Sequence, residues 1–379
     1  MSYDLNIWSV RPFDPAHFRG RGKWTQVSDH FWHWPGKGWQ IALDASTKVE
    51  PEDVPEEVAG LLPGIGWLTE LNLEGDAPAT AMALARKAAK EIAKAAHGVV
   101  EDPQEDAIMT PAGVKRYVPL KNEKKFSVLN FSWWFMTDVL ARRDGREAFL
   151  NLLEKSLPEA MPKRYGTYEP PEHKLEEKGR KHLENFLGTH LDDLIVWYPR
   201  RPVTNVHLRC PDPLGGYWQG FRSNVLEIEI ESAVLDQPGW KPMLDRLWHE
   251  MTRLLEPFYG EIRTVPNQVR MGATVGMMIE DLDDNYDQVT RSWFWRGVPR
   301  NLGHAVVLGR EYQKLWPDFL KHAAMDQEFA FATTARWAGD EDLGSVVGVA
   351  PNEIALLPGE GMGKDQEYPK VWPFGPRFG

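Results

Sequence analysis

The sequence predicts an α+β protein of two units, each a largely antiparallel sheet covered by helices. Segments that alternate apolar and polar residues, as half-buried strands do, stand beside segments with the three- and four-residue apolar spacing of helices. These segments follow no regular β–α–β order. No glycine-rich fingerprint separates a strand from a helix, as it would in a doubly wound nucleotide-binding fold.

The first unit is expected over residues 1–118. Alternating strands are predicted at three places, residues 3–8, 39–43 and 67–73. An alanine-rich helix is predicted over 79–96, with Asp76 as its cap, Pro78 in its first turn and Gly98 after its end. Short returning strands at 99–100 and 107–109 would complete an antiparallel sheet with a helix on one face.

The second unit is expected over residues 123–379, after a stretch rich in Pro, Gly and charge that marks the boundary. A capping-box pattern from Asp144 to Glu147 predicts the start of a helix that Pro158 ends. The remaining elements predicted here are strands at 128–131, 194–198 and 203–208 and helices at 173–187 and 240–258.

The clearest alternation in the chain runs from Leu226 to Glu231. A strand with this pattern turns its Leu and Ile side chains toward the core and its acidic side chains the other way. Glu227, Glu229 and Glu231 are therefore expected to form one outward stripe.

The overall composition favours a protein partner with a basic surface. The 379 residues carry a formal net charge of −11, so a phosphate backbone would be repelled, and direct nucleic-acid binding is not expected. The 17 tryptophans exceed ordinary usage and need burial or a partner.

Other features of the composition indicate the compartment. The single cysteine, Cys210, excludes a disulfide framework within the chain. The first residues show no secretory signal, and no segment approaches the roughly 18 apolar residues needed to cross a bilayer. We therefore expect a cytoplasmic protein without membrane contacts.

Several segments resemble motifs for phosphate or metal binding, but each lacks residues that the binding chemistry requires. The segment 358–365 lacks the first glycine and the Ser or Thr of a phosphate loop. The segment 281–292 starts like a calcium loop but lacks its central glycine and final glutamate. His30 and His33 lie three apart in a segment that favours extended structure. We expect no catalytic residue, metal or cofactor.

Two aromatic segments carry a family resemblance. Tyr165 and Glu169 form a Tyr-x-x-x-Glu motif in a Pro-bounded segment, and Trp295 and Gly297 form a Trp-x-Gly motif. Together these motifs resemble those of the immunity-52 family of bacterial polymorphic-toxin systems, which includes type VI secretion immunity proteins of the TsiT kind. The resemblance covers residues 125–335, and Tyr168 with Glu172 offers a second match to the first motif.

The resemblance implies a protein that binds a cognate nuclease toxin, occludes its active site and protects the producing cell. For Tyr165, Glu169, Trp295 and Gly297 we favour a structural role, because each immunity protein must match a different toxin. The candidate partner-binding residues are acidic, because an acidic surface is steered toward a basic nuclease cleft. They are Glu227, Glu229, Glu231, Glu280, Asp281, Asp283 and Asp284.

Two alternatives stay open. An effector chaperone or adaptor would also form a stable complex, but it would not abolish toxin activity. A hydrolase with a noncontiguous site is suggested by the many carboxylates together with His97, His173, His182 and His207.

Overall fold

The structure is a computed structural model. It describes residues 3–20, 22–28, 31–105, 107–116, 125–168, 171–191, 193, 195–210, 223–271, 274–277, 295, 297–337 and 343–355. The chain divides into two compact units, residues 1–123 with 271–273 and residues 124–270 with 274–379. The described residues of each unit form an antiparallel sheet with helices, so the predicted α+β class is confirmed.

The smaller unit contains a nine-stranded sheet within its described residues. The strand order is β2-β3-β4-β6-β1-β7-β8-β9, and β5 pairs with β6. The strands are β1 (Tyr3–Ser9), β2 (Thr25–Gln26), β3 (Phe31–Pro35), β4 (Trp39–Asp44), β5 (Thr47–Lys48), β6 (Trp67–Gly75), β7 (Gly98–Asp102), β8 (Ala107–Thr110) and β9 (Gly113–Arg116). Between β5 and β6 lies the short helix α1 (Glu56–Ala59).

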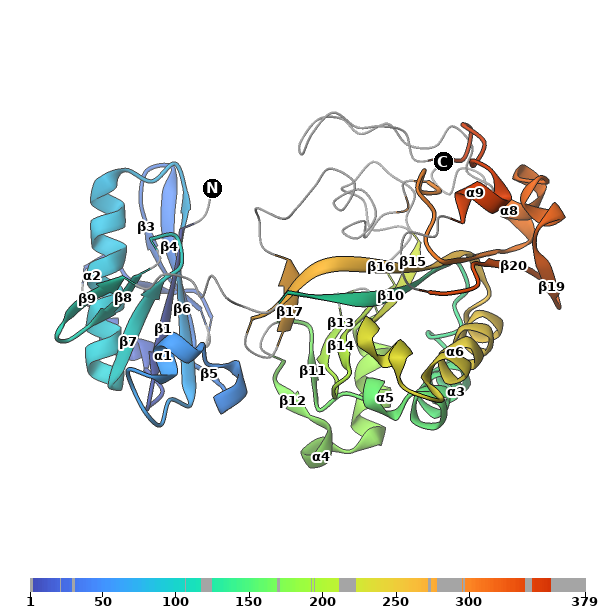
Figure 1. The fold of residues 1–379 in the computed structure, drawn as a ribbon. Coiled ribbons are helices and arrows are strands. Elements are labelled where there is room, and N and C mark those ends of the chain that lie inside the picture. The colour runs from blue at the N-terminus through green and yellow to red at the C-terminus, as the bar shows by residue number, and fades with distance from the viewer. Residues whose placement is uncertain are drawn as a thin grey trace. The chain divides into compact units, whose positions relative to one another are not determined.

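One long helix, α2 (Ala79–Ala96), lies along one face of this sheet (Figure 1). Its bounds confirm the predicted helix. Its inward side is almost entirely alanine, with Ile92, and packs on Leu5, Ile7, Ile41 and Leu71. Small side chains let the helix approach the sheet closely, and the leucine and isoleucine side chains fill the space between them.

The start of α2 differs from the prediction. Its N-cap is Pro78, without a side-chain cap bond, so Asp76 does not cap the helix. Pro78 supplies an extended backbone (φ −73°, ψ 162°), and its carbonyl accepts hydrogen bonds from the N–H groups of Ala81 and Met82. The helix ends at His97, which adopts the left-handed conformation.

The larger unit contains an eleven-stranded sheet within its described residues. The strand order is β12-β11-β13-β14-β15-β10-β16-β18-β20-β19, and β17 pairs with β16. The strands are β10 (Phe126–Phe135), β11 (Arg164–Gly166), β12 (His173–Lys174), β13 (Ile195–Tyr198), β14 (Val203–Arg209), β15 (Asn224–Glu231), β16 (Pro257–Met271), β17 (Thr274–Met277), β18 (Ala305–Leu308), β19 (Ala324–Asp326) and β20 (Phe329–Thr333).

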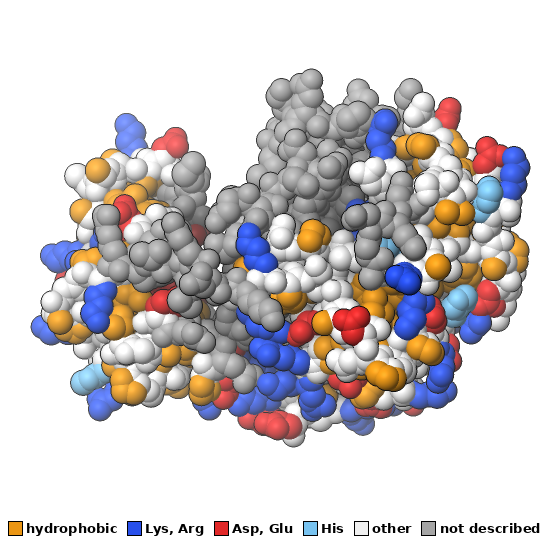
Figure 2. Space-filling model, in the orientation of Figure 1, with side chains coloured by type: hydrophobic (Ala, Val, Ile, Leu, Met, Phe, Trp, Pro, Cys, Tyr) orange, Lys and Arg blue, Asp and Glu red, His pale blue; other side chains and the backbone are white. Residues whose placement is uncertain are grey.

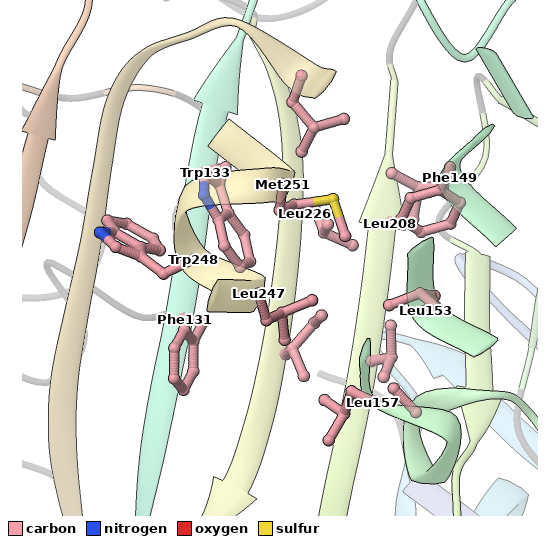
Figure 3. Packing of buried hydrophobic residues seen from close by; sticks show 14 of the residues in the cluster. Phe131, Trp133, Phe149, Leu153, Leu157, Leu208, Leu226, Leu247, Trp248 and Met251 are labelled. Atoms are coloured by element: carbon pink, nitrogen blue, oxygen red, sulfur yellow. The ribbon is translucent and has the colours of Figure 1, made fainter. Parts of the chain in front are cut away.

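Helices cover one face of the larger sheet. They are α3 (Arg143–Ser156), α4 (Leu175–Lys178), α5 (Arg180–Thr189) and α6 (Trp240–Leu255). Below β10 and β15 in Figure 1, α3, α5 and α6 form the covering layer. Figure 3 shows the core between them, where Phe131 and Trp133 of β10 meet Trp248 and Met251 of α6. The indole N–H of Trp133 donates to Thr252 Oγ1 at 3.1 Å.

The opposite face is covered at its β16–β20 end by a second apolar cluster. Two short helices contribute to it, α8 (Arg310–Leu315) and α9 (Gly344–Val347). They pack with Trp134 of β10 and Tyr259 of β16. This cluster and the core on the other face bury many of the tryptophans that the composition shows in excess, and Trp133, Trp197, Trp295, Trp316 and Trp337 are all nearly inaccessible.

Two predicted features of this unit need correction, and one long strand was missed. The capping box is wrong, since α3 starts at Arg143 and its N-cap, Arg142, makes no side-chain cap bond. Gly145 is instead needed for close approach, because a Cβ there would lie 1.8 Å from the carbonyl oxygen of Val139. The helix predicted over 173–187 is two helices, interrupted at Gly179 (φ 78°). The strand β16 was not predicted at all.

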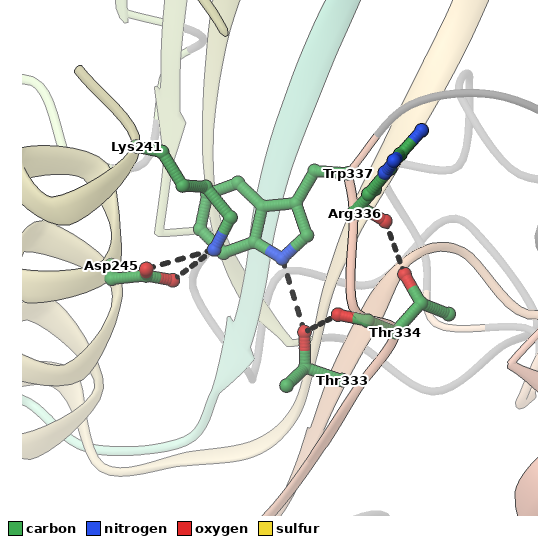
Figure 4. Close-up of polar contacts among 6 residues, drawn as sticks. All are labelled: Lys241, Asp245, Thr333, Thr334, Arg336 and Trp337. Carbon is green, nitrogen blue, oxygen red and sulfur yellow. Dashed lines mark hydrogen bonds and ion pairs between the residues drawn. The ribbon is translucent and has the colours of Figure 1, made fainter. Parts of the chain in front are cut away.

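A polar link joins α6 to the segment after β20 (Figure 4). The ammonium of Lys241 lies 3.5 Å from the ring centroid of Trp337 and donates to Asp245 at 2.6 Å. The indole N–H of Trp337 donates to Thr333 Oγ1 at 3.1 Å. A cation over an indole face is attracted by the ring electrons, so the link holds this segment against α6.

Candidate functional site

The face of the larger sheet opposite α3, α5 and α6 carries polar side chains in rows across neighbouring strands. Cross-strand pairing aligns His207 of β14, Glu227 of β15, Ser132 of β10 and Glu261 of β16. The next row aligns Asn205, Glu229, Asn130 and Arg263. Side chains in one row across an antiparallel sheet are direct neighbours, so these groups interact.

The three glutamates of β15 lie on this face, as predicted, but they are not a freely solvated stripe. All three are half-buried. Asn205 Nδ2 donates to Glu229 Oε2 at 2.6 Å, and Arg270 forms an ion pair with Glu231. Neighbouring strands thus supply partners that the alternation of β15 alone does not reveal.

Glu227 takes part in a hydrogen-bonded chain with its neighbours on β10. Ser132 Oγ donates to Asn130 Oδ1 at 2.7 Å and lies 3.4 Å from Glu227 Oε1. Burial, and then the nearby Glu229, raise the pKa of Glu227 to about 8. A protonated Glu227 can donate to Ser132 Oγ while Ser132 donates onward, so every proton in the chain has an acceptor.

Burial also shifts the neighbouring groups toward their neutral forms. The pKa of Glu229 is raised by burial, against the opposing effect of the Asn205 hydrogen bond. Burial lowers the pKa of His207 to about 4. At neutral pH His207 and Glu227 are thus an uncharged pair, and the Ser132 hydroxyl donates to Asn130 and not to the imidazole. Among the described contacts of Ser132, His207 is therefore not positioned as its base.

Tyr165, the first motif residue, lies in the core of the larger unit on β11. It is fully buried, packs against His173 and Phe186, and its hydroxyl lies 2.7 Å from His182 Nδ1. Burial, followed by the charge of Glu172, raises the pKa of Tyr165 to about 12. The hydroxyl therefore stays protonated and can hydrogen-bond to the imidazole.

The partner of Tyr165 in the Tyr-x-x-x-Glu motif, Glu169, lies outside the described residues. In the second match to this motif, Tyr168 is exposed and Glu172 lies beside β11, because a Cβ on Gly166 would lie 2.2 Å from Glu172 Oε2. Glu172 also lies 3.2 Å from His173 Nε2. The structure thus brings Tyr165 and Glu172 together around two histidines.

The second motif anchors the other apolar cluster. The buried Trp295 donates from its indole N–H to the Tyr312 hydroxyl at 2.5 Å and packs against Trp134 and Tyr259. Gly297 has φ 120°, a backbone conformation that favours glycine. Both residues occupy positions where they support the fold.

The remaining predicted residues fall in different places. Glu280, Asp281, Asp283 and Asp284 lie outside the described residues, as do His30 and the segment 358–365. His97 ends α2, whereas the rings of His173 and His182 meet edge to face with centroids 4.9 Å apart. Among the described residues, no three His, Cys, Asp or Glu side chains are arranged to hold a metal ion.

The smaller sheet has an acidic face that the sequence analysis missed. Leu5, Leu71 and their neighbours point toward α2, so the alternation turns Asp4, Asp44, Glu70 and Glu74 to the other side. Glu70 and Glu74 are exposed, and Asp44 is half-buried. In the described part of the chain, no ion pair reaches Asp44, Glu70 or Glu74, although Gln40 donates to Glu74 at 2.6 Å.

The carboxylates of this face interact unfavourably with one another. Partial desolvation and then the charge of Glu74 raise the pKa of Asp44. Partial desolvation and then the charges of Asp44 and Asp4 raise the pKa of Glu70. The signal was available, because the predicted strands 3–8 and 67–73 place Asp4 and Glu70 at polar positions. We call Asp44, Glu70 and Glu74 the acidic face of the smaller sheet.

Comparison with known proteins gives distant structural likenesses only. No family model matches the chain, and no curated protein matches it. A solved structure of T6SS protein PA0821 from Pseudomonas aeruginosa is similar with a TM-score of 0.37 and 13% identity, over 70% of this chain and 83% of that chain. The immunity-52 assignment therefore remains a resemblance of two short motifs.

Membrane insertion through a helix finds no support in the described elements, since none of their helices is both long and apolar enough to span a bilayer.

Proposed function

We propose that this chain is an immunity protein, which binds a cognate toxin, a nuclease delivered by type VI secretion, and occludes its active site. The observation that carries the proposal is the acidic face of the smaller sheet, where Asp44, Glu70 and Glu74 repel one another and have no cationic partner among the described residues. The two aromatic motifs and the net charge of −11 support the same class.

The physical reason is charge complementarity. A nuclease cleft is basic because it binds a phosphate backbone. A basic surface brought against the acidic face relieves the repulsion among its carboxylates, and the attraction accelerates the encounter more than it strengthens the final complex. Binding of this kind needs no catalytic group on the immunity protein.

The acidic face is a better place to test this proposal than the glutamates of β15. Glu229 and Glu231 hold hydrogen bonds or ion pairs with Asn205 and Arg270, so reversing their charge would disturb the sheet as well as any interface. Asp44 and Glu70 have no such partners in the described structure, and their neutral variants are isosteric.

The experiment begins with the gene next to the one that encodes this chain. A restriction-endonuclease-like toxin encoded there is purified and assayed for nuclease turnover, and the absence of such a gene counts against the proposal. A stoichiometric amount of the protein should abolish turnover, whereas a chaperone or adaptor would leave the complex active. The triple variant Asp44→Asn, Glu70→Gln, Glu74→Gln should associate on the order of tenfold more slowly at low salt. This difference should shrink as salt is added.

The matched control removes the same number of exposed carboxylates elsewhere, in the variant Glu176→Gln, Asp236→Asn, Glu353→Gln. It should associate like the unmodified protein. If turnover persists in a saturated complex, the proposed function is wrong. If both triple variants slow association equally, net charge alone acts and the acidic face is not the contact surface.

A further inference from the structure

The outer side of α2 is basic, although the whole chain is acidic. The helix carries Arg86, Lys87, Lys90 and Lys94 against a single acidic residue, Glu91. The three lysines and Glu91 are exposed. Basic side chains stand out on the side of this unit along which α2 runs (Figure 2). Charge is thus segregated across the unit, with the acidic face of the sheet on one side and α2 on the other.

These residues line a shallow groove along the helix. Two rows of side chains at four-residue spacing form its walls, Arg86-Lys90-Lys94 on one side and Ala83-Lys87-Glu91 on the other. The groove has a volume of about 380 Å³ and is largely open to solvent. Rows and grooves of this kind are what one helix offers to the side chains of another.

The cations along the groove differ in how they are held. Arg86 is fixed by a salt bridge to Asp102 at 3.0 Å and another to Glu105 at 3.3 Å. Within the described structure, Lys87, Lys90 and Lys94 form no ion pair. One wall is therefore rigid at Arg86, and three ammonium groups are available to new partners.

We propose that the groove of α2 is a docking surface for an acidic helix of a partner protein. Carboxylates repeated at four-residue spacing on that helix would meet Lys87, Lys90 and Lys94, and a small or apolar side chain of the same row would lie over Ala83. This proposal is independent of the proposed immunity function, since a basic nuclease cleft would bind the acidic face of the smaller sheet and not the basic groove of α2.

Two observations favour a helix over a phosphate polymer. Glu91 stands in one wall of the groove and would repel a continuous line of phosphates, and the net charge of −11 repels nucleic acid as a whole. A helix can place a neutral or basic residue opposite Glu91. Ala83 also gives one wall of the groove an apolar surface that phosphates do not use.

The test measures binding of a fluorescent alanine-rich helical peptide of about 20 residues with glutamate at every fourth position. The full chain should bind it at low salt, and a glutamine version of the peptide should bind at least tenfold more weakly. The variant Lys87→Glu, Lys90→Glu should lose at least tenfold in affinity. The control variant Lys155→Glu, Lys181→Glu, which changes two other exposed lysines by the same charge, should bind normally.

A second variant separates docking in the groove from general attraction. Ala83→Trp fills the groove without changing its charge and should also weaken peptide binding by at least fivefold, while the circular dichroism spectrum shows that α2 stays folded. The proposal is overturned if the peptide does not bind or if Ala83→Trp binds it normally. It is also overturned if a DNA duplex binds at least as tightly and loses that binding in the Lys87→Glu, Lys90→Glu variant.

Discussion

The two sheets differ in how the carboxylates on their polar faces are buried and hydrogen-bonded. In the larger sheet, Glu227 and Glu229 are half-buried, their pKa values are raised mainly by burial, and side chains on adjacent strands supply hydrogen bonds. In the smaller sheet, Glu70 is exposed, and its pKa is raised by partial desolvation and then by repulsion from Asp44 and Asp4, with no hydrogen-bonding side chain shown to offset it among the described residues. Carboxylates of the first kind belong to the structure, and those of the second kind remain available to a partner.

The largest expected change in stability comes from substitutions on the two faces of β10. Trp133 and Ser132 are neighbours on β10, but Trp133 points into the helix-covered core and Ser132 toward the polar row. Replacing Trp133 with Ala should lower the free energy of unfolding by about 3–5 kcal/mol, because it leaves a cavity and removes the partner of Thr252. Urea unfolding measures this, and Ser132→Ala should lower it by only about 0.5–1.5 kcal/mol.

Glu227 should make the larger unit less stable as the pH rises. The folded state keeps a proton on Glu227 up to about pH 8, whereas the unfolded chain releases it near pH 4.5, so stability decreases between these values. The expected decrease in the free energy of unfolding is about 1 kcal/mol per pH unit or less. Glu227→Gln should abolish it, because the amide does not titrate. Urea unfolding from pH 5 to 9 tests it, with Glu353→Gln as the exposed control. Parallel curves for Glu227→Gln and the unmodified protein would contradict a buried neutral carboxyl.

His207 should have the opposite dependence. Its imidazole stays neutral in the folded state down to about pH 4, while in the unfolded chain it takes up a proton near pH 6.5. Stability due to His207 is therefore lost as the pH falls from about 6.5 to about 4. His207→Gln should flatten the curve in this range, and His322→Gln, which changes an exposed histidine, should not.

The smallest effect is expected on the acidic face of the smaller sheet. Asp44→Asn removes one of the repelling charges and should raise stability by about 0.2–1 kcal/mol at neutral pH and low salt. Because the pKa of Asp44 is raised in the folded state, the gain should disappear as the pH falls below the ordinary carboxyl range, where Asp44 of the unmodified protein is neutral in both the folded and the unfolded state. Thermal unfolding at two salt concentrations measures it, and a loss of stability would show that Asp44 has a structural role.

Local sequence patterns predicted the helices, because their backbone hydrogen bonds join residues that are close in sequence. The alanine-rich run gave the bounds of α2, and the leucine spacing placed α6 within a few residues of its end. The strand β16 was missed because Pro257 and Pro266 interrupt a mixed sequence, and its strand character comes from pairing with β10 and β18.

The candidate sites were harder to predict than the fold. Alternation gave the face of β15 on which Glu227 lies, but its burial depends on β10 and β14, which are distant in sequence. The acidic face of the smaller sheet joins Asp44 and Glu70 from separate strands, so no single segment shows the cluster. Long-range pairing creates both sites, and a single sequence does not specify it.

The position of β10 at the centre of the larger sheet has a consequence during synthesis. Its partner β15 is made roughly 100 residues later, which at ribosomal rates of about 5–20 residues per second leaves β10 unpaired for roughly 5–20 s. During this time Trp133, Trp134 and Phe135 are an apolar segment without the strand partners that β10 has in the finished sheet. The nascent chain therefore presents a target for chaperones before the sheet can close around it.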